Sequence, residues 1–376
     1  MNRFAKILLG LIAVLIIAGV YLLNPRLPSP TGEQSARLYQ PGTLGVSRHS
    51  IALTDNSRPT NANGDFEGLP FRELNGFLWV PEQAEQKPYP LIVYSHGFMS
   101  SVREPEYLVD FLVPKGYAIV AVDYPLSHGG APGGANAGDV INQPGDVSFV
   151  IDALLARNAD EQDSLYGLLD PLRIAVVGLS LGGLTTQFAA YHRDLRDPRL
   201  AAAVSIAGPS AFLERRFFQT TDMPFMMIAG TADAMVPYED NAAPIPDKVD
   251  NGLLVTLHNG SHVGFAGVSS TYMRWFRHPD RWVCPLLLRG LDREDDEAEP
   301  ILVPDSDLGI STAGELPCTM ETFERAMRPA DQHMLTRLAL YAFLEQALAD
   351  DPDRQRQMAR YLTEVFAMEN PPATVR

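Results

Sequence analysis

The 376-residue sequence predicts an α/β fold with a mostly parallel central sheet and helices on both faces of that sheet. Several short segments are continuously apolar, which is typical of strands covered on both faces. Segments with apolar residues at helical spacing lie between them, and this alternation is the order of an α/β fold. Because 46% of the residues are hydrophobic, the chain can bury a substantial core.

Two early segments, near Ser47 to Leu53 and in FRELNGFLWVP (71–81), are expected to form a hairpin. Six apolar runs then predict the remaining strands: YPLIVYSHG (89–97), GYAIVAVDYP (116–125), LRIAVVG (172–178), LAAAVSIAG (200–208), MPFMMIAG (223–230) and GLLVTLHNG (252–260). Helical spacing appears in residues 145–158, in the segment after Ser180, and from Leu340 to Leu348 near the C-terminus.

The N-terminus predicts a hydrophobic helix that directs export. Ile7 to Leu23 form 17 residues without a charge, preceded by Arg3 and Lys6. A helix of that length spans roughly 26 Å, close to the about 30 Å of a bilayer core. Large residues at the end of the run favour a signal anchor over residues 1–24 rather than a cleaved signal peptide. Because positive residues stay inside, we expect the body on the non-cytoplasmic side, or secreted if the segment is cleaved.

Residues 25–45 are rich in proline, glycine and polar residues, so we expect a linker to a single domain over 46–376. The net charge of −16 argues against nucleic acid as a partner, since phosphate binding needs clustered cations. Cys284 and Cys318 are expected to pair in an exported protein, closing a loop of 34 residues, with two unpaired buried thiols as the alternative.

Residues 266–330 interrupt the α/β order and predict an insertion with local structure or a mobile cover, because the segment is too long for an ordinary loop. The insertion holds both cysteines and the acidic run LDREDDEAEP (291–300). That run has no EF-hand spacing, so we interpret it as a solvated charge cluster rather than a calcium site.

The stretch VVGLSLGG (176–183) places Ser180 in a G-x-S-x-G pattern between a strand-like run and a helix-like run. That context is typical of a nucleophile elbow, where a sharp turn with small neighbours exposes the hydroxyl above the sheet edge. A chance turn is the alternative. Ser180 is therefore the candidate nucleophile.

A serine hydroxyl needs a base, and the base needs an orienting carboxylate. Asp233 follows one strand-like run and His262 follows a later one, in the order Ser, Asp, His. Loops at the carboxyl ends of parallel strands meet at one edge, so the three side chains should converge. Other residues compete for these roles. Glu239 and Asp240 could replace the acid, His258 is expected to be a packed strand residue, and His96 and His128 precede the serine.

The tetrahedral intermediate also needs hydrogen-bond donors for its oxyanion. One should be the backbone N–H of Leu181, at the start of the helix after the nucleophile. The other should be the backbone N–H of Phe98 in YSHGFMS (94–100), where Gly97 permits a close approach of the backbone.

The motifs SHGF, GLSLGG, GTADAMVP and GSHVGF resemble the signature positions of the α/β-hydrolase superfamily. The chain is most similar to its dienelactone-hydrolase-like, platelet-activating-factor acetylhydrolase-like and polyester-hydrolase-like branch of serine esterases. The resemblance covers about residues 70–265 and the last helices. A serine at the elbow, where dienelactone hydrolases have cysteine, argues against that enzyme, and the N-terminal segment and the cysteine-bearing insertion are departures.

These observations predict an esterase that cleaves small-molecule or lipid-like carboxylic esters without a metal or organic cofactor. Ser180 is the expected nucleophile, His262 the general base and Asp233 the orienting acid. A peptidase or acyltransferase of the same fold is the alternative, and a non-catalytic anchored binding module is another. The insertion is expected to cover an apolar acyl pocket. Its TYMRWF segment (271–276) either lines that pocket or packs the insertion onto the body.

Overall fold

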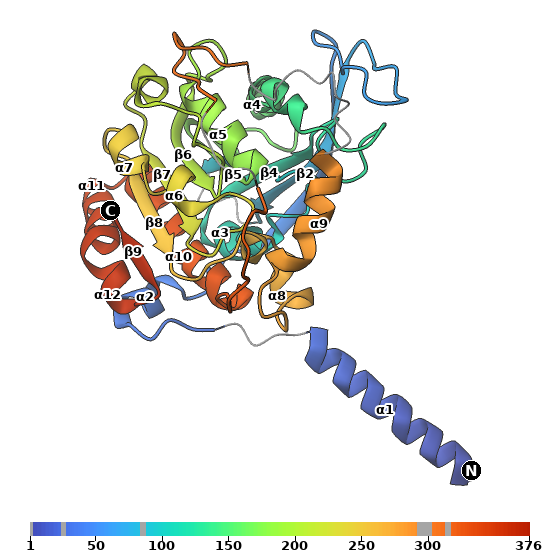
Figure 1. The fold of residues 1–376 in the computed structure, drawn as a ribbon. Helices are drawn as coiled ribbons and strands as arrows, with labels where there is room; N and C mark the ends of the chain where they lie inside the picture. Colours follow the sequence, from blue (N-terminus) through green and yellow to red (C-terminus); the bar gives the residue numbers. More distant parts are fainter. Residues whose placement is uncertain (1–2, 24–27, 83–87, 292–302, 313–316) are drawn as a thin grey trace.

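The computed structural model describes residues 3–23, 28–82, 88–291, 303–312 and 317–376, and their strands form one nine-stranded sheet (Figure 1). The strand order is β1-β2-β4-β3-β5-β6-β7-β8-β9, which fits the expected α/β-hydrolase fold. The strands are β1 (Val46–Asp55), β2 (Arg72–Pro81), β3 (Tyr89–Ser95), β4 (Ala118–Asp123), β5 (Leu169–Leu179), β6 (Leu200–Ile206), β7 (Phe225–Gly230), β8 (Leu253–Leu257) and β9 (Ala373–Val375).

Strands β3 to β8 pair in parallel, whereas β1, β2 and β9 pair antiparallel at the two ends of the sheet. The two early strands form the expected antiparallel pair, and residues 56–71 connect them. The apolar runs are buried on both faces. Along β5, Ile174 and Val176 enter one core, while Ala175 and Val177 enter the other. The strands are therefore apolar along their whole length because both faces of the sheet are buried.

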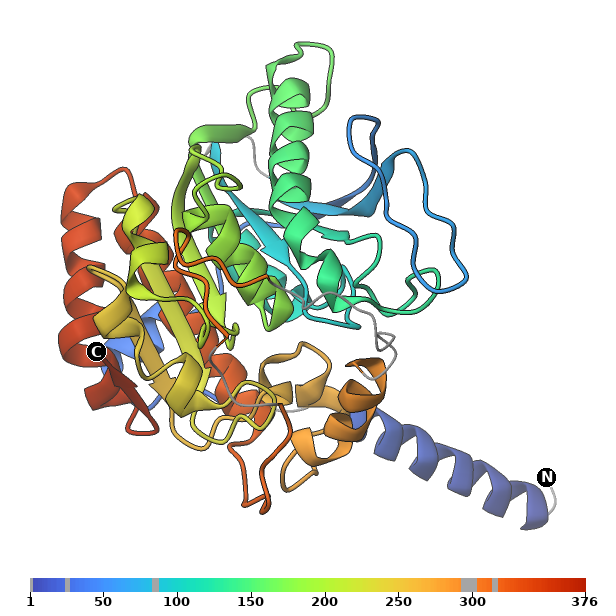
Figure 2. The same cartoon turned by 45° about the horizontal axis from the view of Figure 1, so that its top comes forward.

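Helices cover both faces of the sheet (Figure 2). Helices α4 and α5 pack on the first core, and α3, α10 and α11 pack on the second. The helices are α1 (Arg3–Leu23), α2 (Glu33–Leu38), α3 (Glu106–Leu112), α4 (Gln143–Ala159), α5 (Leu181–Tyr191), α6 (Tyr238–Asn241), α7 (Ile245–Lys248), α8 (Ser269–Tyr272), α9 (Asp280–Leu291), α10 (Pro329–Leu348), α11 (Pro352–Arg360) and α12 (Ala367–Glu369). Short 3₁₀ turns occupy Val113–Lys115, Ala137–Asn142, Arg215–Thr220 and Val263–Phe265, and a π-helical turn occupies Tyr361–Phe366.

The N-terminal segment differs in part from its prediction. Within the described ranges, no helix has both the length and the apolar character needed to cross a bilayer. In the segment expected to be a linker, α2 packs onto the body. The Ser35 hydroxyl lies 2.7 Å from the Tyr361 hydroxyl, and the Glu369 carboxylate accepts the backbone N–H groups of Gln34 and Ser35.

The insertion crosses the loops at the carboxyl ends of the strands. Its described parts are residues 266–291, 303–312 and 317–330, while the acidic residues 292–300 lie outside the described chain. Ser311 bonds to Phe212 after β6, and Cys318 bonds to Ala234 after β7. A disulfide joins Cys284 to Cys318, with 5.7 Å between their Cα atoms. The expected cysteine pair is therefore present and lies beside the strand ends.

Candidate active site

Ser180 occupies the tight turn between β5 and α5. Its φ of 57° and ψ of −120° are strained for a residue with a side chain. The turn is fixed because the Ser180 N–H donates to the Ile206 carbonyl at 2.8 Å and the Leu184 N–H donates to the Ser180 carbonyl at 3.1 Å. This is the local geometry that the G-x-S-x-G pattern predicts, and Ser180 is partly exposed in it.

The glycines of the motif are required by close backbone contacts. A methyl carbon at Gly178 would lie 2.1 Å from the Gly182 carbonyl oxygen. A methyl carbon at Gly182 would lie 2.0 Å from the Ser95 carbonyl oxygen at the end of β3. Any side chain at either position would therefore push the nucleophile turn away from the neighbouring strand.

His262 and Asp233 form a buried pair at the ends of two neighbouring strands. Nδ1 of His262 lies 2.7 Å from Oδ2 of Asp233, and Oδ1 of Asp233 accepts the N–H groups of Met235 at 2.9 Å and Val236 at 2.7 Å. The carboxylate thus acts as an acceptor, which places the imidazole proton on Nδ1 and leaves Nε2 as the basic nitrogen. Burial lowers the pKa of His262, but the charge and hydrogen bond of Asp233, together with the charges of Asp280 and Glu104, outweigh burial and raise that pKa above its usual value.

The competing residues take other positions. His258 was expected to be a packed strand residue, and this is wrong: β8 ends at Leu257, and His258 is exposed just beyond it. His96 is buried, with Nε2 accepting the Tyr124 N–H at 3.1 Å and Nδ1 bonded to the Gly97 carbonyl at 2.8 Å. Burial lowers the pKa of His96 to about 4, so it is a neutral structural residue.

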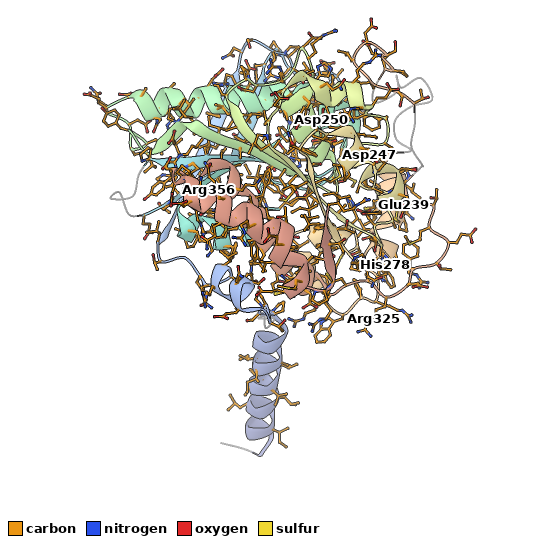
Figure 3. The ribbon with its side chains drawn as sticks, turned by 90° about the vertical axis from the view of Figure 1, so that its left-hand side faces the viewer. Glu239, Asp247, Asp250, His278, Arg325 and Arg356 are labelled. Atoms are coloured by element: carbon orange, nitrogen blue, oxygen red, sulfur yellow. A yellow bond between two sulfur atoms is a disulfide. The ribbon has the colours of Figure 1, made fainter. Side chains whose placement is uncertain are left out.

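Two further candidates make no hydrogen bond to the His262 ring among the described residues. His128 accepts the Gly130 N–H with Nδ1 at 3.2 Å in its own loop. Glu239 is exposed on α6 at the protein surface (Figure 3), while the ring bonds to Asp233.

The loop after β3 lies beside the nucleophile. A methyl carbon on Gly97 would approach the Ser180 Cβ to 3.4 Å. Within the described residues, neither the Phe98 N–H nor the Leu181 N–H donates a hydrogen bond, so both are available to a substrate oxygen. No hydrogen bond joins the Ser180 hydroxyl to the His262 ring in this part of the chain. Such bonds are often long in a free enzyme and shorten when the substrate binds.

Glu104 is a buried carboxyl group beside the site that sequence reasoning missed. Its Oε2 accepts the Tyr94 hydroxyl at 2.9 Å and the Gly97 N–H at 3.0 Å. Burial raises the pKa of Glu104 to about 7, although hydrogen bonds from Ser100, Gly97 and Tyr94 and the nearby His262 lower it. No local pattern marks this residue. Its only sequence signal is its position seven residues after the glycine of the predicted oxyanion loop.

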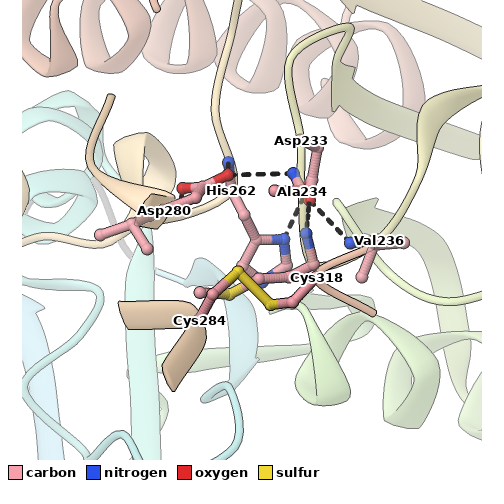
Figure 4. The surroundings of a disulfide bond; sticks show 9 residues. Asp233, Ala234, Val236, His262, Asp280, Cys284 and Cys318 are labelled. Carbon is pink, nitrogen blue, oxygen red and sulfur yellow. Dashed lines mark hydrogen bonds and ion pairs between the residues drawn. A yellow bond between two sulfur atoms is a disulfide. The ribbon is translucent and has the colours of Figure 1, made fainter. Parts of the chain in front are cut away.

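Asp280 is the second carboxyl group that was missed. It is wholly buried and accepts the backbone N–H groups of Ala234 and His262 (Figure 4). It also accepts the backbone N–H group of Val263. The sequence signal was weak, because an aspartate at the start of a helix is an ordinary feature. For metals, no group of three or more His, Cys, Asp or Glu side chains in the described ranges could hold an ion.

Residues 74–280 match a family described as PET hydrolase-like, and these residues are more than half of the chain. The chain is also 26% identical, over 154 residues, to a Bacillus subtilis (strain 168) protein named "Putative esterase YitV". That similarity covers 40% of this chain and 55% of the relative, so the chain spans about half of the relative's length. The family match contains Ser180, Asp233 and His262 and ends at Asp280.

Proposed function

Because this chain belongs to the PET hydrolase-like family of α/β-hydrolase-type esterases, we propose that it is a serine-dependent carboxylic ester hydrolase that uses Ser180 as its nucleophile. One observation carries the proposal. A strained serine in a G-x-S-x-G turn lies on the same sheet edge as a buried imidazole whose Nδ1–H is held by a carboxylate. That arrangement supplies a nucleophile, a base and an orienting acid.

In the first half of the reaction, the Ser180 Oγ attacks the ester carbonyl carbon and Nε2 of His262 takes the hydroxyl proton. Asp233 holds the imidazole in the Nδ1–H form and stabilises its positive charge. The carbonyl oxygen becomes an oxyanion that the Phe98 and Leu181 N–H groups bind. When the C–O bond to the alcohol breaks, Nε2 returns the proton to the leaving alkoxide, and an acyl-serine remains.

In the second half, His262 takes a proton from water, and the resulting hydroxide attacks the acyl carbon. The same two N–H groups bind the second oxyanion. The bond to Ser180 Oγ then breaks, Nε2 returns the proton to the serine, and the carboxylic acid leaves. All proton transfers pass through one imidazole, so no other acid or base is required.

The test compares Ser180→Ala with a Ser306→Ala control, which changes an exposed serine of the insertion. Ser180→Ala should lower the turnover of p-nitrophenyl esters by about 10⁴ or more, with an unchanged thermal midpoint. A fluorophosphonate probe should label the wild type and the control but not Ser180→Ala. Wild-type turnover in purified Ser180→Ala would refute the assignment of the nucleophile. A panel of esters with different acyl chain lengths, assayed with the wild type, would define the substrate class.

We also propose that the catalytic domain is exported. Support comes from the Cys284–Cys318 disulfide, since such bonds persist in oxidising compartments, and from the cationic and then apolar order of the N-terminus. In the native host, fractionation should place the activity outside the cytosol, with both cysteines resistant to alkylation until a reductant is added. Cytosolic activity with freely alkylated thiols would overturn this proposal.

A further inference from the structure

Asp280 connects the two loops that hold the candidate acid and base. Its Oδ2 accepts the Ala234 N–H at 3.0 Å and the His262 N–H at 2.9 Å, and its Oδ1 accepts the Val263 N–H at 2.8 Å. Ala234 directly follows Asp233 in the chain. One carboxylate oxygen is therefore shared by the acid loop after β7 and the base loop after β8, as Figure 4 shows.

The disulfide fixes this carboxylate in place. Cys284 lies one turn after Asp280 in α9, and its partner Cys318 donates its N–H to the Ala234 carbonyl at 2.6 Å. Both backbone groups of Ala234 are thus held by the insertion. Cys284 also packs with Ala234, Met235 and Val263 in a small apolar cluster.

An ordinary structural role does not account for these contacts. An acidic residue at a helix start usually caps its own first turn, but both oxygens of Asp280 bond to loops outside α9. Asp280 forms no ion pair with a cation among the described residues. Burying a carboxylate without a cation is costly unless hydrogen bonds replace the lost water, and here all three come from the two loops of the candidate site.

We propose that Asp280 is a positioning residue, which holds the acid and base loops together so that His262 stays aligned with Asp233 and Ser180. The inference rests on the proposed function, because alignment matters only if His262 is the base. It extends the site beyond the three predicted side chains to a residue at the end of the family match, in a helix that continues past it.

The charge of Asp280 has a second effect. Three carboxyl groups face His262: Asp233 from the loop after β7, Asp280 from α9 and Glu104 from the loop after β3. Each negative charge favours the imidazolium form and so raises the pKa of His262, against the lowering effect of burial. Removing the Asp280 charge while keeping its shape should therefore lower the pKa of the base.

Asp280→Asn in the full chain tests both effects. An amide presents an N–H₂ group where a carboxylate oxygen accepted an N–H, so two donors would face each other. We expect kcat for p-nitrophenyl esters to fall by about 10- to 100-fold with little change in KM. The acid limb of the kcat/KM profile should also move to lower pH. Wild-type kcat, or a reduced kcat with an unmoved limb, would overturn the proposal.

Two further variants complete the experiment. Asp305→Asn is the matched control, because Asp305 is in the insertion and accepts the N–H groups of Asp307 and Leu308 within its own turn. It should keep the wild-type kcat and limb. Asp280→Glu keeps the charge but displaces the oxygens, so it should lower kcat and leave the limb in place. If Asp280→Asn does not fold, wild-type kcat in Asp280→Glu overturns the proposal.

Ser180→Ala, assayed in parallel, separates this proposal from the proposed function. If Ser180→Ala stays active, the proposed function fails. If Ser180→Ala is inactive while Asp280→Asn keeps the wild-type kcat, only the role of Asp280 fails.

Discussion

His262 and Asp233 are 29 positions apart in the chain, yet Nδ1 of the histidine lies 2.7 Å from Oδ2 of the aspartate. The contact follows from topology, because β7 and β8 are adjacent parallel strands and each residue belongs to the loop that leaves its strand. The same rule brings the loops after β3 and β5 to this edge. A site with no contiguous sequence is therefore assembled by strand order.

Replacing His262 and His258 one at a time should show which of the two histidines is the general base. His262→Ala should lower ester turnover by several orders of magnitude, of order 10⁴ or more, because it removes the proton acceptor. His258→Ala should leave turnover and the thermal midpoint near wild type, since His258 is exposed beyond the end of β8. Steady-state kinetics on both purified variants would check this. If only His258→Ala lost activity, the general base would be His258 and not His262.

The pH dependence of activity should reflect the raised pKa of His262. A general base must be neutral, so kcat/KM falls as the pH drops through the pKa of the base. Because that pKa is raised above 6.5, the decline should already begin above pH 6.5. Asp233→Asn removes the partner that raises it most and should shift the decline to lower pH. A wild-type profile that stays flat down to pH 5 would contradict the assignment.

Glu104 should make the protein less stable as the pH rises. Its pKa in the folded protein, about 7, lies above its usual value of 4.5. Its contribution to the free energy of unfolding is therefore complete below pH 4.5 and is lost as the pH rises through 7. The loss is of the order of 3 kcal/mol at most. Glu104→Gln should flatten the change in urea midpoint between pH 5 and pH 8.

Glu106→Gln is the matched control for that measurement, because Glu106 pairs with Arg103 at the surface. It should keep the wild-type pH dependence. If Glu104→Gln retains the full wild-type slope, the buried carboxyl is not the group responsible.

The insertion should limit the size of the acyl group that enters the site. Residues 303–312 lie against the loop after β6, where Ser311 bonds to Phe212 and Ile310 pairs with Leu213. Replacing residues 292–312 with a short flexible linker keeps Asp280 and both cysteines. Hydrolysis of p-nitrophenyl acetate should stay within about twofold of wild type, while turnover of bulky esters should rise severalfold.

The Cys284–Cys318 disulfide, checked by thiol titration before and after reduction, is the control for that replacement. An unchanged ratio of bulky to small ester turnover would leave the insertion as a structural element.

The aromatic segment of the insertion does not simply pack onto the body, because Tyr272 is 68% exposed and Trp275 is 66% exposed. These two side chains remain candidates for contact with a bulky substrate.

Sequence reasoning predicted the parallel core and placed Ser180, Asp233 and His262 in loops that the fold brings to one edge. It could do so because buried parallel strands are apolar along their whole length, and because close backbone contacts leave no room for a side chain at Gly178 or Gly182, on either side of the serine. It misjudged His258, since an apolar run does not mark the residue at which a strand ends.

The carboxyl groups of Glu104 and Asp280 could not be predicted in the same way. The role of Asp280 depends on backbone N–H groups that are distant in sequence, such as that of Ala234, 46 positions away. Glu104 contacts the nearer Gly97 N–H, and this contact depends on how the loop after β3 folds back on itself. No side-chain pattern encodes such a contact. The short strand β9 was missed for a similar reason: three residues near the C-terminus have no periodicity, and only pairing with β8 defines them.

That last strand protects the sheet that leads to His262. The N–H and carbonyl groups of Leu254 bond to Arg376, and the His258 N–H bonds to the Pro372 carbonyl, so β9 covers the outer edge of β8. An uncovered edge strand is a template for pairing with another chain. Truncation before Ala373 would therefore expose the unpaired edge of β8, one loop away from the candidate base. Self-association would be expected before any loss of ester hydrolysis. Affinity tags for this protein are better placed elsewhere than against Arg376.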